Sequence, residues 1–96
     1  MLENFNKAFE SKARLGIMSV LMVNEFLSFN SLKDLLNLTD GNLATHLRAL
    51  EESNYLNVQK QFIGRKPNTT YMATAAGKKA FEDHLSDLEQ FIKRQS

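Results

Sequence analysis

Apolar residues recur at intervals of three and four through most of this chain, and they alternate with polar residues over two short stretches. Spacing of three and four predicts amphipathic helices, whereas alternation predicts half-buried strands. The expected helices cover the start of the chain (Leu2, Phe5 and Phe9), about 12–27, 31–37, about 40–53 and about 20 residues after Thr74. The expected strands are 55–62 and 69–73, joined by a turn over 64–68.

Polar residues that commonly begin or end helices stand between these segments. Ser31 is a candidate N-cap for the helix over 31–37, after a break at 28–30 that can hold a very short strand. Thr39 or Asp40 is expected to cap the next helix and Thr74 the last one. Asn54 suits the left-handed position that often closes a helix.

The resulting order is helix, helix, helix, β-hairpin, helix. It predicts a mainly α fold with a small β-hairpin (α+β), a winged helix-turn-helix in which the outer helices serve dimerisation. With 96 residues and no linker or repeat, the chain is expected to form a single winged-helix DNA-binding domain over 1–96. This arrangement presents one helix and one loop together to a DNA duplex.

The helix over about 40–53 separates its apolar and polar side chains. At about 100° per residue, Leu43, Leu47 and Leu50 fall together and are expected to face the core. The opposite face is small or polar, as a recognition helix in a major groove requires. Asn42 can pair with adenine and Arg48 with guanine or phosphate. An ordinary amphipathic helix is the alternative. The expected DNA contacts here are Thr39, Gly41, Asn42, Thr45, His46 and Arg48, with Lys33 of the preceding helix as a weaker phosphate contact.

The following hairpin is basic. Net charge is only +1, but no acidic residue occurs between Ser53 and Phe81. Arg65 and Lys66 lie at the expected turn, so a wing over about 62–69 is expected at the minor groove or the DNA backbone. A solvated hairpin with an excess of lysine is the alternative. The expected wing contacts are Lys60, Arg65, Lys66 and Asn68.

The first and last helices are expected to form a homodimer. Between residues 12 and 27, Leu15, Met18, Met22 and Phe26 lie on one helical face, and Ile17, Val20 and Leu21 lie on the other. A helix that is apolar on two sides must be buried on two sides, here against its own core and a partner subunit. The expected dimer contacts are Phe5, Phe9, Ile17, Val20, Leu21, Leu85, Leu88, Phe91 and Ile92.

Two blocks of sequence resemble a known family. Residues 41–51 with Tyr55-Leu56, and then residues 69–81, are similar to small winged-helix regulators related to the multiple-antibiotic-resistance and arsenic-repressor type transcription factors. The resemblance implies a homodimeric, sequence-specific DNA-binding regulator, taken here as a repressor. Two departures limit it. The thiolates of metal-sensing members are absent, and the chain is shorter than drug-sensing members, so no effector is assigned.

Other functions have weaker support. His46 and His84 lie in different helices without a ligand set, so no metal is expected, and no cofactor is expected either. The sequence has no nucleophile elbow and no phosphate-binding loop, and no carboxylate pair sits in an evident cleft, so we expect no enzyme. The lack of cysteine, of a signal peptide and of a membrane-length apolar run predicts a cytoplasmic protein. The alternative function is a winged helix that binds proteins and not DNA.

Overall fold

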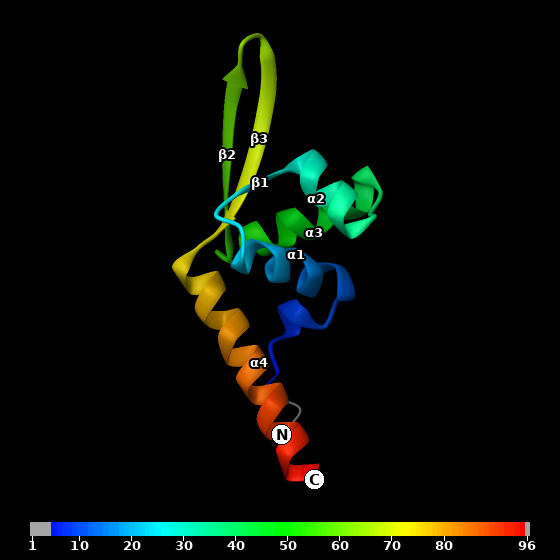
Figure 1. Ribbon diagram of the computed structural model, residues 1–96, viewed down its shortest axis with the longest axis vertical. Helices are drawn as coiled ribbons and strands as arrows, with labels where there is room; N and C mark the ends of the chain where they lie inside the picture. Colours follow the sequence, from blue (N-terminus) through cyan, green and yellow to red (C-terminus); the bar gives the residue numbers. More distant parts are fainter. Residues whose placement is uncertain (1–4, 96) are drawn as a thin grey trace.

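The computed structural model describes residues 5–95 and confirms the expected α+β winged helix-turn-helix. A body of three helices carries a long hairpin at one end and a long helix at the other (Figure 1), so the molecule measures 55 × 25 × 21 Å. The elements are η2 (Lys7–Phe9), α1 (Lys12–Met22), β1 (Leu27–Ser28), α2 (Phe29–Leu36), α3 (Asp40–Glu52), β2 (Leu56–Ile63), β3 (Lys66–Ala73) and α4 (Ala75–Gln95). None of the helices described combines the length and the apolar character that a bilayer span requires.

The sheet is antiparallel with the strand order β1-β3-β2. Its long pair, β2 and β3, runs from Leu56 opposite Ala73 to Ile63 opposite Lys66. The short strand β1 pairs only with Thr70 and Tyr71, at the base of the hairpin. Beyond that base, all residues of β2 from Gln59 onward are exposed, so the outer half of the hairpin projects from the body as a wing.

One apolar core joins the N-terminal turn to all the helices. The ring of Phe9 stacks on Tyr55 and meets the ring of Phe81 edge-on. Burial of these side chains is the main stabilising term of a domain this small. The buried apolar residues are Phe9, Ile17, Met18, Leu21, Leu32, Leu43, Leu47, Leu50, Leu56 and Phe81.

A tight junction fixes α4 to the end of α3. Asn54 closes α3 with φ 64°, as expected for this position. The hydroxyl of Thr74 donates to the carbonyl of Asn54 at 2.7 Å and accepts from the Gly77 amide at 2.8 Å. The Thr74 amide donates to the Tyr55 carbonyl at 3.0 Å. These bonds confirm Thr74 as the cap of the last helix and set the direction of α4 relative to α3.

Several expected boundaries were wrong. The helix predicted over about 12–27 ends at Met22, and Phe26 is exposed in the connection to β1. The described part of the predicted first helix is a single 3₁₀ turn, while Leu2 lies outside the described residues. The N-cap of α2 is Ser28 and not Ser31, because the Ser28 hydroxyl accepts the Ser31 amide hydrogen.

The hairpin turn is also shorter than predicted. Ile63 pairs with Lys66, so only Gly64 and Arg65 form the turn, and Gly64 has φ 66°. A two-residue turn of this kind requires positive φ, which glycine adopts without strain.

Three expected dimer residues belong to the protomer's own core. Phe9, Ile17 and Leu21 are 3%, 0% and 1% exposed in the single chain, so they have no surface to offer a partner. Assigning them to a dimer interface was wrong. The helix α1 is apolar on two sides because η2, α2, α3, α4 and the sheet surround it within one protomer.

Candidate nucleic-acid interface

The outer face of α3 is exposed as expected, and its leucines are buried. Gly41, Asn42, Thr45 and Arg48 all lie on the solvent side. The hydroxyl of Thr45 donates to the Gly41 carbonyl at 2.9 Å. Thr39 caps the helix by accepting the Asn42 amide at 3.2 Å. The Thr39 side chain is therefore committed to holding the helix start.

The start of α3 carries an ion pair that the sequence did not reveal. The Lys33 ammonium lies 2.9 Å from a carboxylate oxygen of Asp40. The hydrogen bond to Asp40, together with its charge, raises the pKa of Lys33. This pair links α2 to α3 and places a carboxylate where the helix amides would attract a phosphate. Asp40 would therefore compete with a phosphate for Lys33.

His46 lies on the side of α3 that turns toward α1. It is half-buried, and its Nδ1 accepts a hydrogen bond from Arg14 Nε at 3.2 Å. The contact ties α3 to α1 and orients the imidazole. Arg14 is not predicted as a site residue from the sequence, because its helical face carries no recognisable motif.

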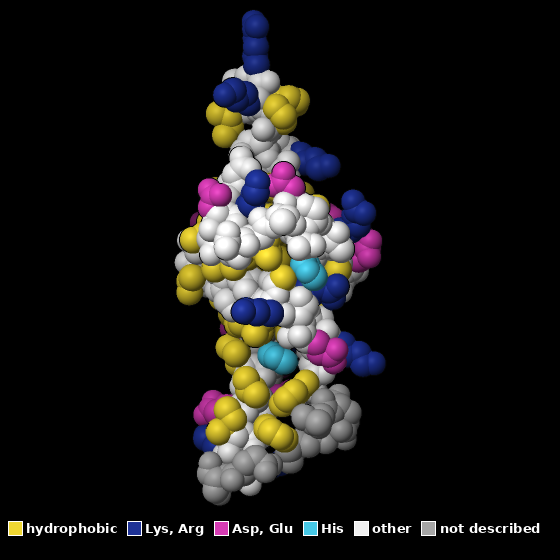
Figure 2. All heavy atoms as spheres, turned by 90° about the vertical axis from the view of Figure 1, so that its right-hand side faces the viewer, with side chains coloured by type: hydrophobic (Ala, Val, Ile, Leu, Met, Phe, Trp, Pro, Cys, Tyr) yellow, Lys and Arg dark blue, Asp and Glu magenta, His cyan; other side chains and the backbone are white. Residues whose placement is uncertain are grey.

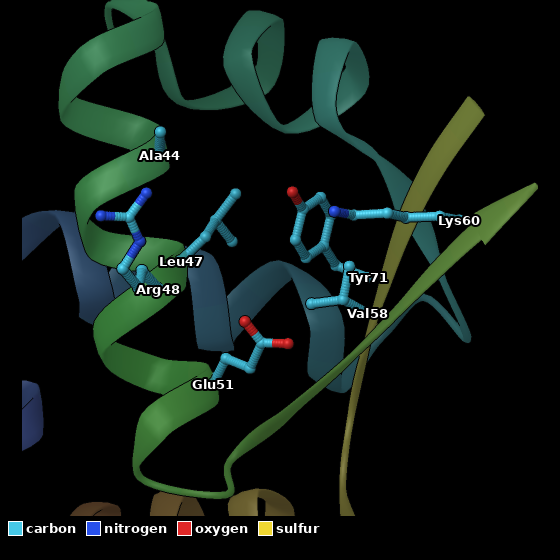
Figure 3. Close-up of a pocket in the computed structure, with 7 residues that line it drawn as sticks. All are labelled: Ala44, Leu47, Arg48, Glu51, Val58, Lys60 and Tyr71. Atoms are coloured by element: carbon cyan, nitrogen blue, oxygen red, sulfur yellow. The ribbon is translucent and has the colours of Figure 1, made fainter. Parts of the chain in front are cut away.

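A groove separates α3 from the base of the wing, and residues from both elements line it (Figure 3). Its volume is about 480 Å³. Figure 3 shows Lys60 extending from β2 toward α3, with the ring of Tyr71 beside it. Burial and then the Glu51 charge raise the pKa of Tyr71 above 10.0, so its hydroxyl stays a neutral donor at pH 7. The lining residues are Ala44, Leu47, Arg48, Glu51, Val58, Lys60 and Tyr71.

The structure thus brings Arg48 and Lys60 to one groove, although nothing in the sequence pattern links these two residues. Arg65 and Lys66 are exposed at the far end of the hairpin. Figure 2 shows Lys and Arg side chains at this end, with hydrophobic side chains on both sides just below them. Asn68 lies further down β3, beside the start of α2, and not at the turn.

The sequence did not single out the exposed apolar residues of the wing. The alternation of the strand puts Phe62 on the same face as Leu56, which is buried, and Val58, which is half-buried. The wing, however, extends past the body, so Phe62 is 73% exposed and its neighbour Ile63 is 65% exposed. Only the three-dimensional length of the hairpin distinguishes them from core residues.

The remaining dimer candidates behave differently from the three that are buried. Leu85, Leu88 and Ile92 are exposed large apolar residues on α4. Phe91 is half-buried and meets the ring of Phe5 edge-on at 5.8 Å, and Val20 is half-buried against the core. An apolar stripe on a projecting helix is the part of this set that a second molecule could cover.

Residues 13–92 match the family described as winged helix DNA-binding domain. An uncharacterized protein from Methanocaldococcus jannaschii is 38% identical over 87 residues, which cover 91% of this chain and 95% of the relative.

Solved structures share the fold. A transcriptional regulator homologue protein from Pyrococcus horikoshii superposes with a TM-score of 0.80 and 29% identity, covering 94% of both chains. YusO from Bacillus subtilis gives a TM-score of 0.83 over 98% of this chain and 66% of its own, and at 18% identity it shows the fold alone.

Proposed function

The chain belongs to the winged helix DNA-binding domain family, and from this premise we propose that it binds a specific duplex sequence as a homodimeric transcriptional repressor. In this proposal α3 enters the major groove and the wing reaches the adjacent minor groove or the backbone. We propose repression because a protein bound at an operator that overlaps a promoter blocks transcription by occupancy alone. We place the protein with its DNA, in the cytoplasm.

One observation carries the proposal: Arg48 of α3 and Lys60 of the wing line the same groove. A recognition helix and a wing that act on one duplex must hold the intervening sugar-phosphate strand between them. Two cations on opposite walls suit that strand, and the neutral Tyr71 hydroxyl adds a donor. Glu51 is the acidic residue in this groove and would repel a phosphate, but it lies near the C-terminal end of α3, away from the helix start.

The exposed stripe on α4 supports the dimer. Joining two copies through Leu85, Leu88 and Ile92 would remove apolar surface from water. A twofold pair would present two recognition helices roughly 34 Å apart, and this geometry implies a pseudo-palindromic operator. Phosphate neutralisation by two wings would make the affinity steeply dependent on salt.

The test begins with selection of bound duplexes from a random pool by the purified protein, followed by titration of the winner at two salt concentrations. We expect an inverted repeat and a steep salt slope. The double variant Arg65→Glu with Lys66→Glu should abolish binding of that duplex while leaving the mass in light scattering unchanged.

The matched control is Lys93→Glu with Arg94→Glu. It changes the charge equally, at the end of the molecule opposite the wing, and among the described residues loses only the exposed ion pair between Lys93 and Glu89, so it should retain binding. Equal affinity of the wing variant and wild type would contradict the wing assignment. Failure to enrich any duplex would instead favour a protein-binding module, for which Glu51 in the groove is the supporting observation.

A further inference from the structure

The end of the wing exposes two large apolar side chains next to its cations. Phe62 and Ile63 precede the turn at Gly64 and Arg65, and most of each side chain is in contact with water. Figure 2 shows this combination of hydrophobic and basic side chains at the far end of the hairpin. Exposed apolar surface of this kind is unfavourable unless a partner covers it.

The two side chains point to opposite faces of the hairpin, because successive residues of a strand alternate. Phe62 shares its face with Val58 and Lys60, which line the groove against α3. Its cross-strand neighbour on that face is Pro67. Ile63 lies on the other face, opposite Lys66. Only Phe62 therefore continues the surface that the DNA strand would follow.

The distance from Lys60, in the protein's groove, to the end of the wing also suits the spacing between the major and minor grooves of DNA. From Lys60 the strand rises roughly 7 Å to Phe62 and roughly 13 Å to the turn at Gly64, at about 3.3 Å per residue. The major and minor grooves are offset by about half a helical turn, roughly 17 Å. The end of the wing therefore comes close to the minor groove beside the site of α3, and the side chain of Phe62, two residues before the turn, extends toward it.

We propose that Phe62 is an apolar wedge that enters the minor groove and partly unstacks one base step there. The inference rests on the proposed function. Its occupant is DNA because the charge around the wedge is positive, with Lys60, Arg65 and Lys66 on a hairpin that carries no acidic residue. Apolar wedges in minor grooves act at steps that unstack readily, above all pyrimidine–purine steps such as TA. Phe62 thus sets a sequence preference where no hydrogen bond is made.

The experiment compares Phe62→Ala with Ile63→Ala on the duplex selected by the wild-type protein. Both substitutions remove an exposed apolar side chain at adjacent positions, so equal folding by circular dichroism is expected and checked. We expect Phe62→Ala to weaken binding at least about fivefold, as loss of an aromatic contact with bases does, and Ile63→Ala to stay within about twofold.

A second readout separates a wedge from a general loss of contact. The TA step beneath the wing is replaced by AA, and 2-aminopurine is placed at the step to report unstacking. Wild-type protein should raise the probe's fluorescence and discriminate the two steps several-fold, whereas Phe62→Ala should do neither. Equal discrimination by both proteins, or equal losses for the two alanine variants, would overturn the wedge and leave DNA binding standing. If the wild-type protein binds no duplex, both proposals fall together.

Discussion

Substituting alanine for Gly77 and for Gly41 should change the free energy of unfolding in opposite directions. Gly77 lies in the first turn of α4, and a Cβ built there would lie 3.0 Å from both the Cα and the carbonyl carbon of Tyr55, and closer still to its oxygen. The obstacle is backbone, which has no rotamer to change. Gly41 is also helical, yet a Cβ there would meet nothing within 4 Å. Gly41→Ala is therefore the matched control for Gly77→Ala.

The magnitudes follow from the contacts. Forcing a methyl group into a packed site costs about 1–3 kcal/mol. Separating α4 from Tyr55 also weakens the hydrogen bond from the Thr74 amide to the Tyr55 carbonyl, by about 0.5–1.5 kcal/mol. Against these costs, the higher helix propensity of alanine stabilises α4 by up to about 1 kcal/mol. We expect Gly77→Ala to destabilise the fold by about 2 kcal/mol. Gly41→Ala has only the favourable contribution, about 0.5 kcal/mol.

Thermal unfolding followed by circular dichroism measures both effects at one protein concentration. For a domain of this size, 1 kcal/mol corresponds to about 4–8 °C, so Gly77→Ala should lower Tm by about 8–16 °C and Gly41→Ala should raise it by about 2–4 °C. A Tm for Gly77→Ala equal to that of wild type would refute the close approach of α4 to Tyr55. Gly41→Ala should bind DNA more weakly despite its higher Tm, because its methyl group stands on the face assigned to the duplex.

Three further predictions concern DNA readout, assembly and pH. Arg48→Ala should cost about 1–3 kcal/mol of binding free energy and relax the sequence preference. Lys66→Ala should weaken binding to all sequences evenly and lower the salt slope by about one. If titrations at several salt concentrations show the same behaviour for both variants, these roles are contradicted. Leu88→Glu should convert the dimer to a monomer in light scattering, while Ser86→Glu, on the polar side of α4, should leave the mass unchanged. Because the pKa of Tyr71 is raised above 10.0 in the folded protein, the unfolded chain loses the phenol proton at lower pH than the folded chain does. The free energy of unfolding should therefore fall as pH rises past 10.0. Tyr71→Phe should reduce this fall, which thermal unfolding between about pH 9 and pH 11 measures.

Local patterns predicted α3 well because the determinants of this helix are close together in the sequence. The leucine spacing fixes which face is buried, Thr39 caps the start and Asn54 adopts the left-handed conformation that ends it. None of these features depends on a distant residue. The same is true of Thr74, whose cap lies within the turn that begins α4.

The dimer residues were harder to predict because periodicity shows that a face is apolar but not what covers it. Phe9 meets Tyr55 and Phe81, which are far from it in the sequence, and these contacts place it in the core. The groove was missed for a similar reason. Arg48 and Lys60 belong to different elements, and only the way the hairpin folds back beside α3 brings them together.

In the wing, the length of the turn decides how far the paired strands extend and therefore where the predicted site residues lie. A two-residue turn at Gly64 and Arg65 makes β3 begin at Lys66, so Pro67 stands opposite Phe62 in a paired strand. Proline is tolerated there because β1 stops at Thr70 and leaves β3 without a neighbour on that side. The longer paired hairpin holds Phe62 and Arg65 at a defined distance from α3, where a loose loop over 64–68 would not. In the proposed wedge, a paired hairpin would favour insertion of Phe62 at a base step, because a flexible loop would lose more conformational entropy on binding.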